Sequence, residues 1–116
     1  MTSIATLTLN PTIDVAYEVD HIQHTRKMRT RTEYYEPGGG GINVARVFVR
    51  LGGNARNYYL SGGATGHALD GLLDEHRLVR NRIAIRGHTR VATAVLDRET
   101  GKEYRLVPPG PTVEPA

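Results

Sequence analysis

Glu36-Pro-Gly-Gly-Gly-Gly-Ile-Asn-Val-Ala-Arg46 is the stretch that decides the fold, because four consecutive glycines separate a strand-like run from an amphipathic helix. Without Cβ atoms, the backbone from Gly38 to Gly41 can touch a ligand directly and can adopt positive φ at little cost. The helix that follows begins with unpaired N–H groups, which suit oxygen-rich ligands. Asn43 adds an amide within this first turn, and an amide can both donate and accept hydrogen bonds. The stretch therefore predicts a site for a small polar ligand.

The glycine run has three alternative interpretations. A flexible glycine-rich loop is one, but a strand pattern and a helix pattern bracket the run, rather than low-complexity sequence. A nucleotide P-loop is another, and the segment lacks the Gly-Lys-Ser/Thr ending that places a lysine on phosphate and a hydroxyl on magnesium. The third is a dinucleotide turn, whose spaced Gly-x-Gly-x-x-Gly pattern is also missing.

Length and composition fit one domain or part of one. The chain has 116 residues, of which 15 are basic and 12 acidic, and a formal net charge of +3. The arginines are spread along the chain, so no nucleic-acid partner is expected. Cysteine is absent, which excludes disulfides and thiolate metal sites and fits a cytoplasmic protein. No apolar run reaches membrane-spanning length, and residues 1–10 do not have the pattern of a signal peptide, so no membrane partner is expected.

Strands and helices alternate along the first two thirds of the chain. The apolar and alternating patterns predict strands over residues 4–9, 14–19, 28–35 and 55–60. A helix is predicted over 41–51, with apolar residues sharing one face at Val44, Val47, Phe48 and Leu51, and Gly52-Gly53 as its stop. A second helix follows the glycines at 62–66 and runs to about His76, with Leu69, Leu72 and Leu73 on one side. This repeated strand, glycine turn and helix is typical of a parallel α/β sheet.

The last third contains strands without helices. A short strand is predicted over 83–85, and a hairpin joins strands 90–96 and 103–107 across the turn 97–102. The proline-rich end, 108–116, predicts no regular element. These alternating strands, together with those between 14 and 36, predict a small antiparallel sheet that projects from the parallel core.

A series of motifs follows in order along the chain: Thr6-Leu-Thr-Leu-Asn-Pro11 with Asp14, the stretch 36–46, Leu51-Gly-Gly53, Gly62-Gly-Ala-Thr-Gly66, Thr89-Arg90, Tyr104-Arg105 and Pro109-Gly110. With these motifs, the chain resembles the N-terminal part of the phosphofructokinase-B group of ribokinase-like sugar kinases, closest to the 6-phosphofructokinase and 1-phosphofructokinase branch. The resemblance covers nearly the whole chain. It implies an α/β fold: a ribokinase-like parallel sheet with flanking helices, truncated, and a small antiparallel β lid. Lid strands are then expected at about 14–36 and 89–107, and core elements at about 4–9 and 41–85, within one domain portion spanning 1–116.

The resemblance also implies a set of substrate-binding residues. Asp14 matches the acid that grips sugar hydroxyls, since a carboxylate accepts two such bonds well; a turn cap after Pro11 is its alternative role. Gly38, Gly39 and Asn43 match the sugar-contacting turn. The residues that match phosphate-binding positions are Lys27, Arg90 and Arg105. A guanidinium suits phosphate through paired donors, although each of the three, taken singly, fits a solvated surface charge.

The same resemblance implies ATP-dependent phosphoryl transfer to a phosphorylated fructose, with ATP and Mg²⁺ as cofactors of the complete enzyme and a homodimer formed through the lid sheet. The chain departs from the group because the Gly-Ala-Gly-Asp segment with the catalytic base and the Asn-x-x-Glu motif linked to magnesium are missing. Phosphoryl transfer needs base, metal and anion stabilisation together. We therefore expect no catalytic residue in this chain and no catalysis by it alone. The five histidines are scattered and predict no metal site.

Three functions stay open at this point. The first is the N-terminal portion of a phosphofructokinase, the second a non-catalytic module that holds a sugar phosphate, and the third a protein that pairs through the lid with a full-length relative. We favour the first. The acceptor remains open among fructose 6-phosphate, fructose 1-phosphate and tagatose 6-phosphate. A core that lacks several strands also predicts marginal stability or self-association of the isolated chain.

Overall fold

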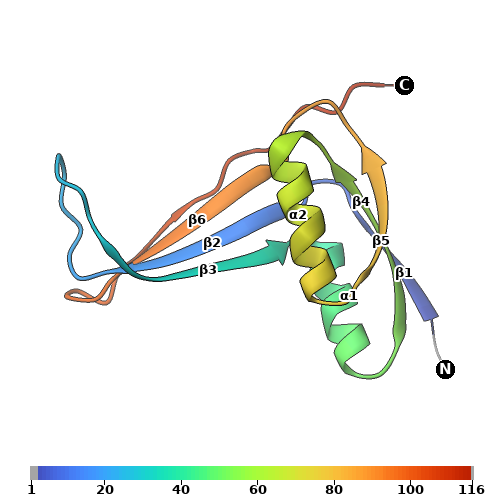
Figure 1. Ribbon diagram of the computed structural model, residues 1–116, viewed down its shortest axis with the longest axis horizontal. Coiled ribbons are helices and arrows are strands. Elements are labelled where there is room, and N and C mark those ends of the chain that lie inside the picture. Colours follow the sequence, from blue (N-terminus) through green and yellow to red (C-terminus); the bar gives the residue numbers. More distant parts are fainter. Residues whose placement is uncertain (1–2, 116) are drawn as a thin grey trace.

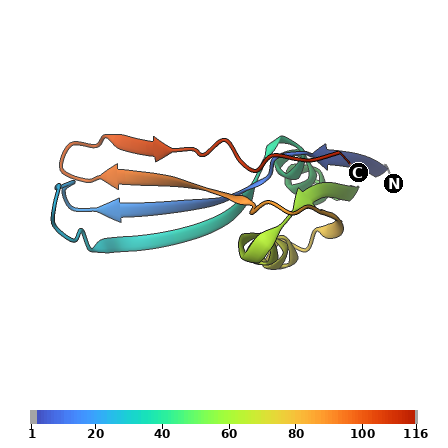
Figure 2. The same cartoon turned by 90° about the horizontal axis from the view of Figure 1, so that it is seen from above.

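Two sheets, joined end to end, form an elongated molecule of 48 × 36 × 19 Å (Figures 1 and 2). The computed structural model describes residues 3–115, so the predicted outer boundaries at residues 1 and 116 lie outside it. A three-stranded sheet with both helices forms one end of the molecule, and a four-stranded sheet extends away from it to form the lid. The predicted fold class, α/β with a helix-flanked parallel sheet and a second small sheet, is confirmed.

The core sheet is parallel and has the strand order β1-β4-β5. Its strands are β1 (Ser3–Thr8), β4 (Asn54–Ser61) and β5 (Val79–Ala84), and its helices are α1 (Gly40–Arg50) and α2 (Gly63–Glu75). Because the connections from β1 to β4 and from β4 to β5 step in the same direction, right-handed crossovers place both helices on one side of the sheet. Figures 1 and 2 show this arrangement, with α1 and α2 on the side that faces the lid.

The helices bury unequal parts of their apolar surface. The fully buried residues of α2 include Leu69 and Leu73, as its predicted face requires. In α1 the buried residues are instead Ile42 and Ala45. Three of the four residues of the apolar face predicted for this helix point outward, with exposed fractions of 54% for Val44, 57% for Val47 and 81% for Leu51, whereas Phe48 is half-buried.

A close approach between α1 and β1 explains this orientation. A Cβ at Gly41 would lie 2.5 Å from the Thr8 hydroxyl and 2.9 Å from the Leu7 carbonyl oxygen. The helix therefore contacts the strand through its side-chain-free and small residues, and its larger aliphatic residues turn away from the sheet.

The lid consists of four strands in the order β3-β2-β6-β7. They are β2 (Thr12–Val19), β3 (Thr30–Gly38), β6 (Arg90–Asp97) and β7 (Glu103–Leu106). The pairs β2–β3 and β6–β7 are antiparallel, as predicted, whereas the central pair β2–β6 is parallel. The parallel pair arises because β2 follows β1 and β6 follows β5, so both strands leave the same edge of the parallel core and run in the same direction.

The far end of the lid is fastened by one buried carboxylate. Asp97 accepts hydrogen bonds from the backbone N–H groups of Ile22 (3.1 Å), Glu99 (2.9 Å) and Thr100 (3.1 Å). The backbone donors, led by Ile22, hold the pKa of Asp97 below its usual value. The bond to Ile22 attaches the loop between β2 and β3 to the turn between β6 and β7. This loop covers residues 20–29. The strand predicted over 28–35 therefore begins two residues later than expected, at Thr30.

Candidate functional site

The glycine turn joins the lid to α1 and lies directly under an acidic side chain. Gly39 is the N-cap residue of α1 and has φ of 122°, which a side chain would rarely allow. A Cβ at Gly38 would lie 2.3 Å from Asp14 Oδ2, so the carboxylate rests on the bare backbone. Asn43 is exposed in the first turn of the helix, where its N–H donates to the Gly39 carbonyl (2.9 Å). Four of the seven predicted site residues thus lie together.

The pairing of β2 with β3 and β6 forms a shallow hollow on this face of the lid. Asp14 is opposite Glu36 on one side and Ala92 on the other, while Ala16 is opposite Tyr34 and Ala94. Because the three alanines have short side chains, the centre of this sheet face is recessed, and longer side chains border it. The hollow measures about 300 Å³, and its border includes Asp14, Tyr34, Glu36 and Arg105. A concavity of this size, with few polar groups converging on it, suits a small-molecule ligand.

Asp14 is electrostatically coupled to both predicted phosphate-binding arginines. Partial burial raises the pKa of the Asp14 carboxyl above 3.8, and the hydroxyl of Thr12 acts in the opposite direction. The charges of Arg90 and Arg105 also lower this pKa, while Glu36 raises it. The site therefore combines an acceptor for hydroxyl groups with nearby cations, which is the combination that a sugar phosphate requires.

The two arginines differ in how firmly they are held. Arg90 is half-buried, and its guanidinium donates to the carbonyls of Asn10 (3.1 Å) and Pro108 (3.2 Å). Its Nε is buried and has no partner within residues 3–115. The Arg105 side chain is 74% exposed, with its Nε 3.8 Å from a Glu103 carboxylate oxygen. Arg105 can therefore turn toward a ligand, whereas Arg90 also ties the β1–β2 connection to the segment after β7.

Lys27 is the one predicted site residue that the fold keeps apart. It lies in the exposed loop 20–29, which Figure 1 shows at the end of the lid farthest from the helices. Asp14 is near the opposite end of β2, and the five residue-to-residue steps from Asp14 to Val19 alone span roughly 17 Å in a strand. Within one chain, Lys27 therefore does not converge with Asp14 and the glycine turn.

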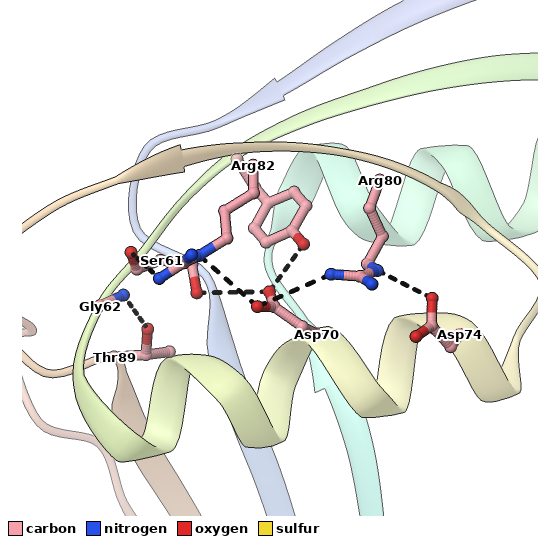
Figure 3. Close-up of polar contacts among 8 residues, drawn as sticks. Ser61, Gly62, Asp70, Asp74, Arg80, Arg82 and Thr89 are labelled. Carbon is pink, nitrogen blue, oxygen red and sulfur yellow. Dashed lines mark hydrogen bonds and ion pairs between the residues drawn. The ribbon is translucent and has the colours of Figure 1, made fainter.

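Thr89 fastens the lid to the core and was not assigned a role from the sequence. Its N–H donates to the Gly62 carbonyl (3.0 Å), and its hydroxyl accepts from the Gly62 N–H (3.2 Å). Its carbonyl accepts from the Thr65 hydroxyl (2.6 Å). Figure 3 shows the Gly62–Thr89 contact at the start of α2. Because Thr89 immediately precedes Arg90, this clamp sets where the central lid strand β6 begins.

A buried polar cluster lies beside the clamp, farther along α2 (Figure 3). Asp70 on α2 accepts hydrogen bonds from the hydroxyls of Tyr59 (2.7 Å) and Ser61 (3.3 Å), both on β4. It also forms ion pairs with Arg80 (3.7 Å) and Arg82 (3.5 Å) on β5. Burial, together with the bond to Asp70, raises the pKa of Tyr59 well above its usual value. The cluster holds three elements together below the second glycine turn.

Thr89→Val is expected to lower the free energy of unfolding by about 1–3 kcal/mol, because the buried Gly62 N–H loses its acceptor. Valine keeps the shape and the β propensity of threonine. Urea denaturation followed by circular dichroism measures the loss. Thr30→Val, at an exposed position of β3, is the matched control and should change little. Equal midpoints for the two variants would contradict a clamping role for Thr89.

The structure was also compared with the requirements of a metal site and of a membrane-spanning helix. Within residues 3–115, no group of three histidine, cysteine or acidic side chains is placed to hold a metal ion. Neither of the two helices in this part of the chain has the length and apolar character needed to cross a membrane.

The geometry defines a class of protein: an α/β domain portion with a shallow hollow between a glycine turn and a β lid. The chain belongs to the pfkB family of carbohydrate kinases, whose family model matches residues 5–113. It is 43% identical over 110 residues to ATP-dependent 6-phosphofructokinase isozyme 2 of Mycobacterium tuberculosis, covering 95% of this chain and 32% of the relative. It is 32% identical to tagatose-6-phosphate kinase of Staphylococcus epidermidis, covering 96% of this chain and 35% of that enzyme.

Solved structures agree with this assignment. Phosphofructokinase-2 from Escherichia coli, in complex with fructose-6-phosphate, superposes with a TM-score of 0.84 at 40% identity, over 95% of this chain and 36% of that one. Another structure of the same enzyme is its tetrameric inhibited form. The chain thus spans about a third of the length of its relatives and corresponds to their N-terminal part. The predicted family and fold are confirmed.

Proposed function

We propose that this chain is the substrate-binding and lid portion of an ATP-dependent kinase that phosphorylates a fructose phosphate. The observation that carries the proposal is the Asp14 carboxylate resting on Gly38 at the border of the lid hollow, with Arg105 on the same border. Relatives named as 6-phosphofructokinases and tagatose-6-phosphate kinase support a sugar-phosphate ligand. Because both sugars occur among the relatives, fructose 6-phosphate is the acceptor to test first and tagatose 6-phosphate the second.

Each predicted residue has a distinct part in the proposed complex. Asp14 accepts hydrogen bonds from sugar hydroxyls, and Gly38 and Gly39 let the backbone approach the sugar without intervening side chains. The exposed amide of Asn43 contributes a donor and an acceptor from α1. Arg90 and Arg105 bind the phosphate, because each guanidinium group offers paired hydrogen-bond donors to the charged oxygens. Lys27 completes the set of substrate-binding residues.

A homodimer formed through the lid is part of this proposal. The loop that carries Lys27 lies at the far end of the lid from its own glycine turn. Under the proposal, Lys27 therefore approaches the substrate held by a second subunit. The tetrameric form of the E. coli enzyme supports assembly in this family but does not specify which surface is used.

ATP and Mg²⁺ belong to the complete enzyme in this proposal. The pfkB family consists of carbohydrate kinases, and the first relatives are ATP-dependent. The donor set of residues 3–115 does not fit a metal site of three acidic or histidine ligands. We assign no catalytic base, no metal contact and no step of phosphoryl transfer to this chain. A cytoplasmic location likewise stays a prediction.

Asp14→Asn is expected to raise the KM for fructose 6-phosphate at least tenfold, while the KM for ATP changes less than about twofold. A hydrogen bond to a charged acceptor contributes about 1.5–3 kcal/mol, and about 1.4 kcal/mol corresponds to a factor of ten. The measurement uses this chain fused in place of the matched third of the E. coli relative. Asp74→Asn, on the exposed side of α2, is the matched control. An equal rise in both KM values for Asp14→Asn would refute the assignment of Asp14 to the sugar.

A non-catalytic binding module is the second candidate, because the hollow, Asp14, the glycine turn and Arg105 are all present in this chain. Amide NMR of the separate 116-residue chain, titrated with fructose 6-phosphate, tests it. Dispersed peaks that shift between Gly38 and Asn43 would show that the chain binds the sugar phosphate by itself. A dispersed spectrum that the sugar phosphate leaves unchanged would exclude the binding module.

A further inference from the structure

A buried carboxylate holds the beginning of the loop at the far end of the lid (Figure 1). This loop, the lid-tip loop, covers residues 20–29. The Ile22 N–H donates to Asp97 Oδ2 (3.1 Å), and His21 Nδ1 lies 3.5 Å from the same oxygen and 2.8 Å from Glu99 Oε2. Asp97 is only 2% exposed, so water competes little for its oxygens. The beginning of the lid-tip loop is therefore fixed to the turn between β6 and β7.

The rest of the lid-tip loop, which carries Lys27, has no such attachment. Within residues 3–115, the polar contacts of residues 23–29 stay inside the loop, where the Gln23 N–H donates to Met28 Sδ (3.1 Å). Lys27 is exposed between these two residues. Because this segment closes on itself and follows directly after Ile22, the place where Ile22 is held determines where Lys27 lies.

The two oxygens of Asp97 bind different segments. Oδ1 accepts hydrogen bonds from N–H groups of its own turn, whereas Oδ2 accepts from Ile22 in the lid-tip loop. Asp97 follows Ala92, which faces the hollow, by five positions in β6, so the alternation of side chains places Asp97 on the opposite face of the lid. Asp97 can therefore affect a bound substrate only by way of the lid-tip loop.

We infer that Asp97 is a positioning residue, which holds Lys27 where it meets the phosphate of the substrate bound to a second subunit. The inference rests on the proposed function, in which Lys27 approaches that substrate. His21 supports the same attachment, because its ring lies between the carboxylates of Asp97 and Glu99. A lysine ammonium is a point charge on a flexible stem, so it binds a phosphate well only where its backbone is held. Loss of the Oδ2 contact would therefore weaken the binding of the sugar phosphate and leave ATP binding unchanged.

Asp97→Asn separates the two roles of this side chain. The amide oxygen can keep the bonds of Oδ1, while the NH₂ group would face the Ile22 N–H and cannot accept from it. In the fused enzyme described above, the KM for fructose 6-phosphate should rise about tenfold, since a charge-assisted contact with the phosphate is weakened, and the KM for ATP should change less than about twofold. Asp20→Asn is the matched control. It removes only an exposed ion pair with Arg31 beside the same loop, so both KM values should stay within about twofold.

Two further variants separate positioning from damage to the fold. His21→Ala removes a side chain that is 51% exposed and should raise the KM for fructose 6-phosphate about threefold. In a Lys27→Ala background, Asp97→Asn should raise this KM no further, because the residue through which it acts is gone. An unchanged KM for Lys27→Ala alone would overturn the inference, as would a further rise of about tenfold in the double variant.

Mixed dimers test the crossing between subunits. Fused subunits with Asp14→Asn and fused subunits with Asp97→Asn are co-expressed with different tags, and the dimer that contains one of each is purified. One of its two sites then has an intact Asp14 and receives Lys27 from the subunit whose Asp97 is intact. We expect half of the wild-type kcat at the wild-type KM for fructose 6-phosphate.

A raised KM in every site of the mixed dimer would overturn the inference, and so would a fused enzyme that sediments as a monomer. The proposed function fails by a different result, an unchanged KM for fructose 6-phosphate in the enzyme whose subunits all carry Asp14→Asn. In that case the combination of Asp97→Asn with Lys27→Ala would still decide whether Asp97 acts through Lys27.

Discussion

Gly39→Ala is expected to lower the free energy of unfolding by about 3 kcal/mol. Its φ of 122° combined with a ψ of 149° is a backbone conformation that essentially only glycine adopts. A Cβ there would also lie 2.6 Å from a Thr8 methyl carbon and 3.3 Å from Pro11 Cα, so the strand β1 and its turn would have to shift. Backbone strain of about 1–3 kcal/mol and overpacking of about 1–3 kcal/mol act together at this residue. Urea denaturation of the chain measures the sum.

The neighbouring glycine provides the control. Gly40 is the first residue of α1, and a Cβ added there would have no atom within 4 Å. Gly40→Ala should therefore be neutral or stabilise the chain by about 0.5–1 kcal/mol, since alanine has less conformational freedom to lose in the unfolded state. Changes of opposite sign in the free energy of unfolding for these two adjacent substitutions would show that the glycine run forms a turn with a defined backbone conformation. Similar losses at both positions would instead indicate that the run merely needs flexibility.

The glycine turn and the core units were predictable because their signals are local. A strand pattern, side-chain-free residues and a helix pattern follow one another within residues 28–51, and each signal depends only on near neighbours. The expectation that Asp14 and Gly38 share one site followed only from the family resemblance, and the contact between them comes from the structure. In physical terms it depends on β2 pairing with β3, which brings together residues 24 positions apart.

The features that the sequence did not reveal depend on contacts between distant segments. The parallel pairing of β2 with β6 joins strands that are separated by both helices, and no local pattern encodes it. The outward turn of Val44 and Val47 follows from the close approach of Gly41 to β1, which periodicity in α1 cannot show. Without the family resemblance, Arg90 fitted an ordinary surface arginine, and nothing in the sequence indicated that two carbonyl oxygens accept hydrogen bonds from it.

The cluster around Asp70 had no sequence signal at all. Its members are spread from Tyr59 to Arg82, and none of them belongs to a recognisable motif. An aspartate within a predicted helix, such as Asp70 on α2, is usually a solvated surface residue. In this structure Asp70 is only 7% exposed, and its carboxylate accepts hydrogen bonds from two hydroxyl groups. We therefore expect the stability of the core to depend on a residue that sequence analysis would rank as ordinary.

Asp70→Ala is expected to lower the free energy of unfolding by about 2–4 kcal/mol. Tyr59 has no exposed surface, so its hydroxyl would lose its acceptor where water cannot replace it. Removing one partner of a buried ion pair costs about 3–5 kcal/mol. The Arg80 and Arg82 side chains are 36% and 33% exposed, however, and water can solvate part of their charge. The range of about 2–4 kcal/mol includes this discount. Urea denaturation measures the loss.

Two further variants separate the buried hydrogen bonds from the exposed ion pairs. Asp70→Asn retains an oxygen that can accept from Tyr59, so about half of the loss should disappear. Asp74→Asn removes only the exposed pair with Arg80, whose Asp74 side chain is 59% exposed, and should cost less than about 0.5 kcal/mol. If Asp74→Asn lowered the free energy of unfolding as much as Asp70→Ala, the ion pairs of both carboxylates with Arg80 would be the main stabilising interaction. The buried hydrogen bonds from the hydroxyls to Asp70 would then contribute little. The expected order, with Asp70→Ala first, Asp70→Asn second and Asp74→Asn last, instead assigns the stability of the β4–α2–β5 unit to the hydrogen bonds that water cannot reach.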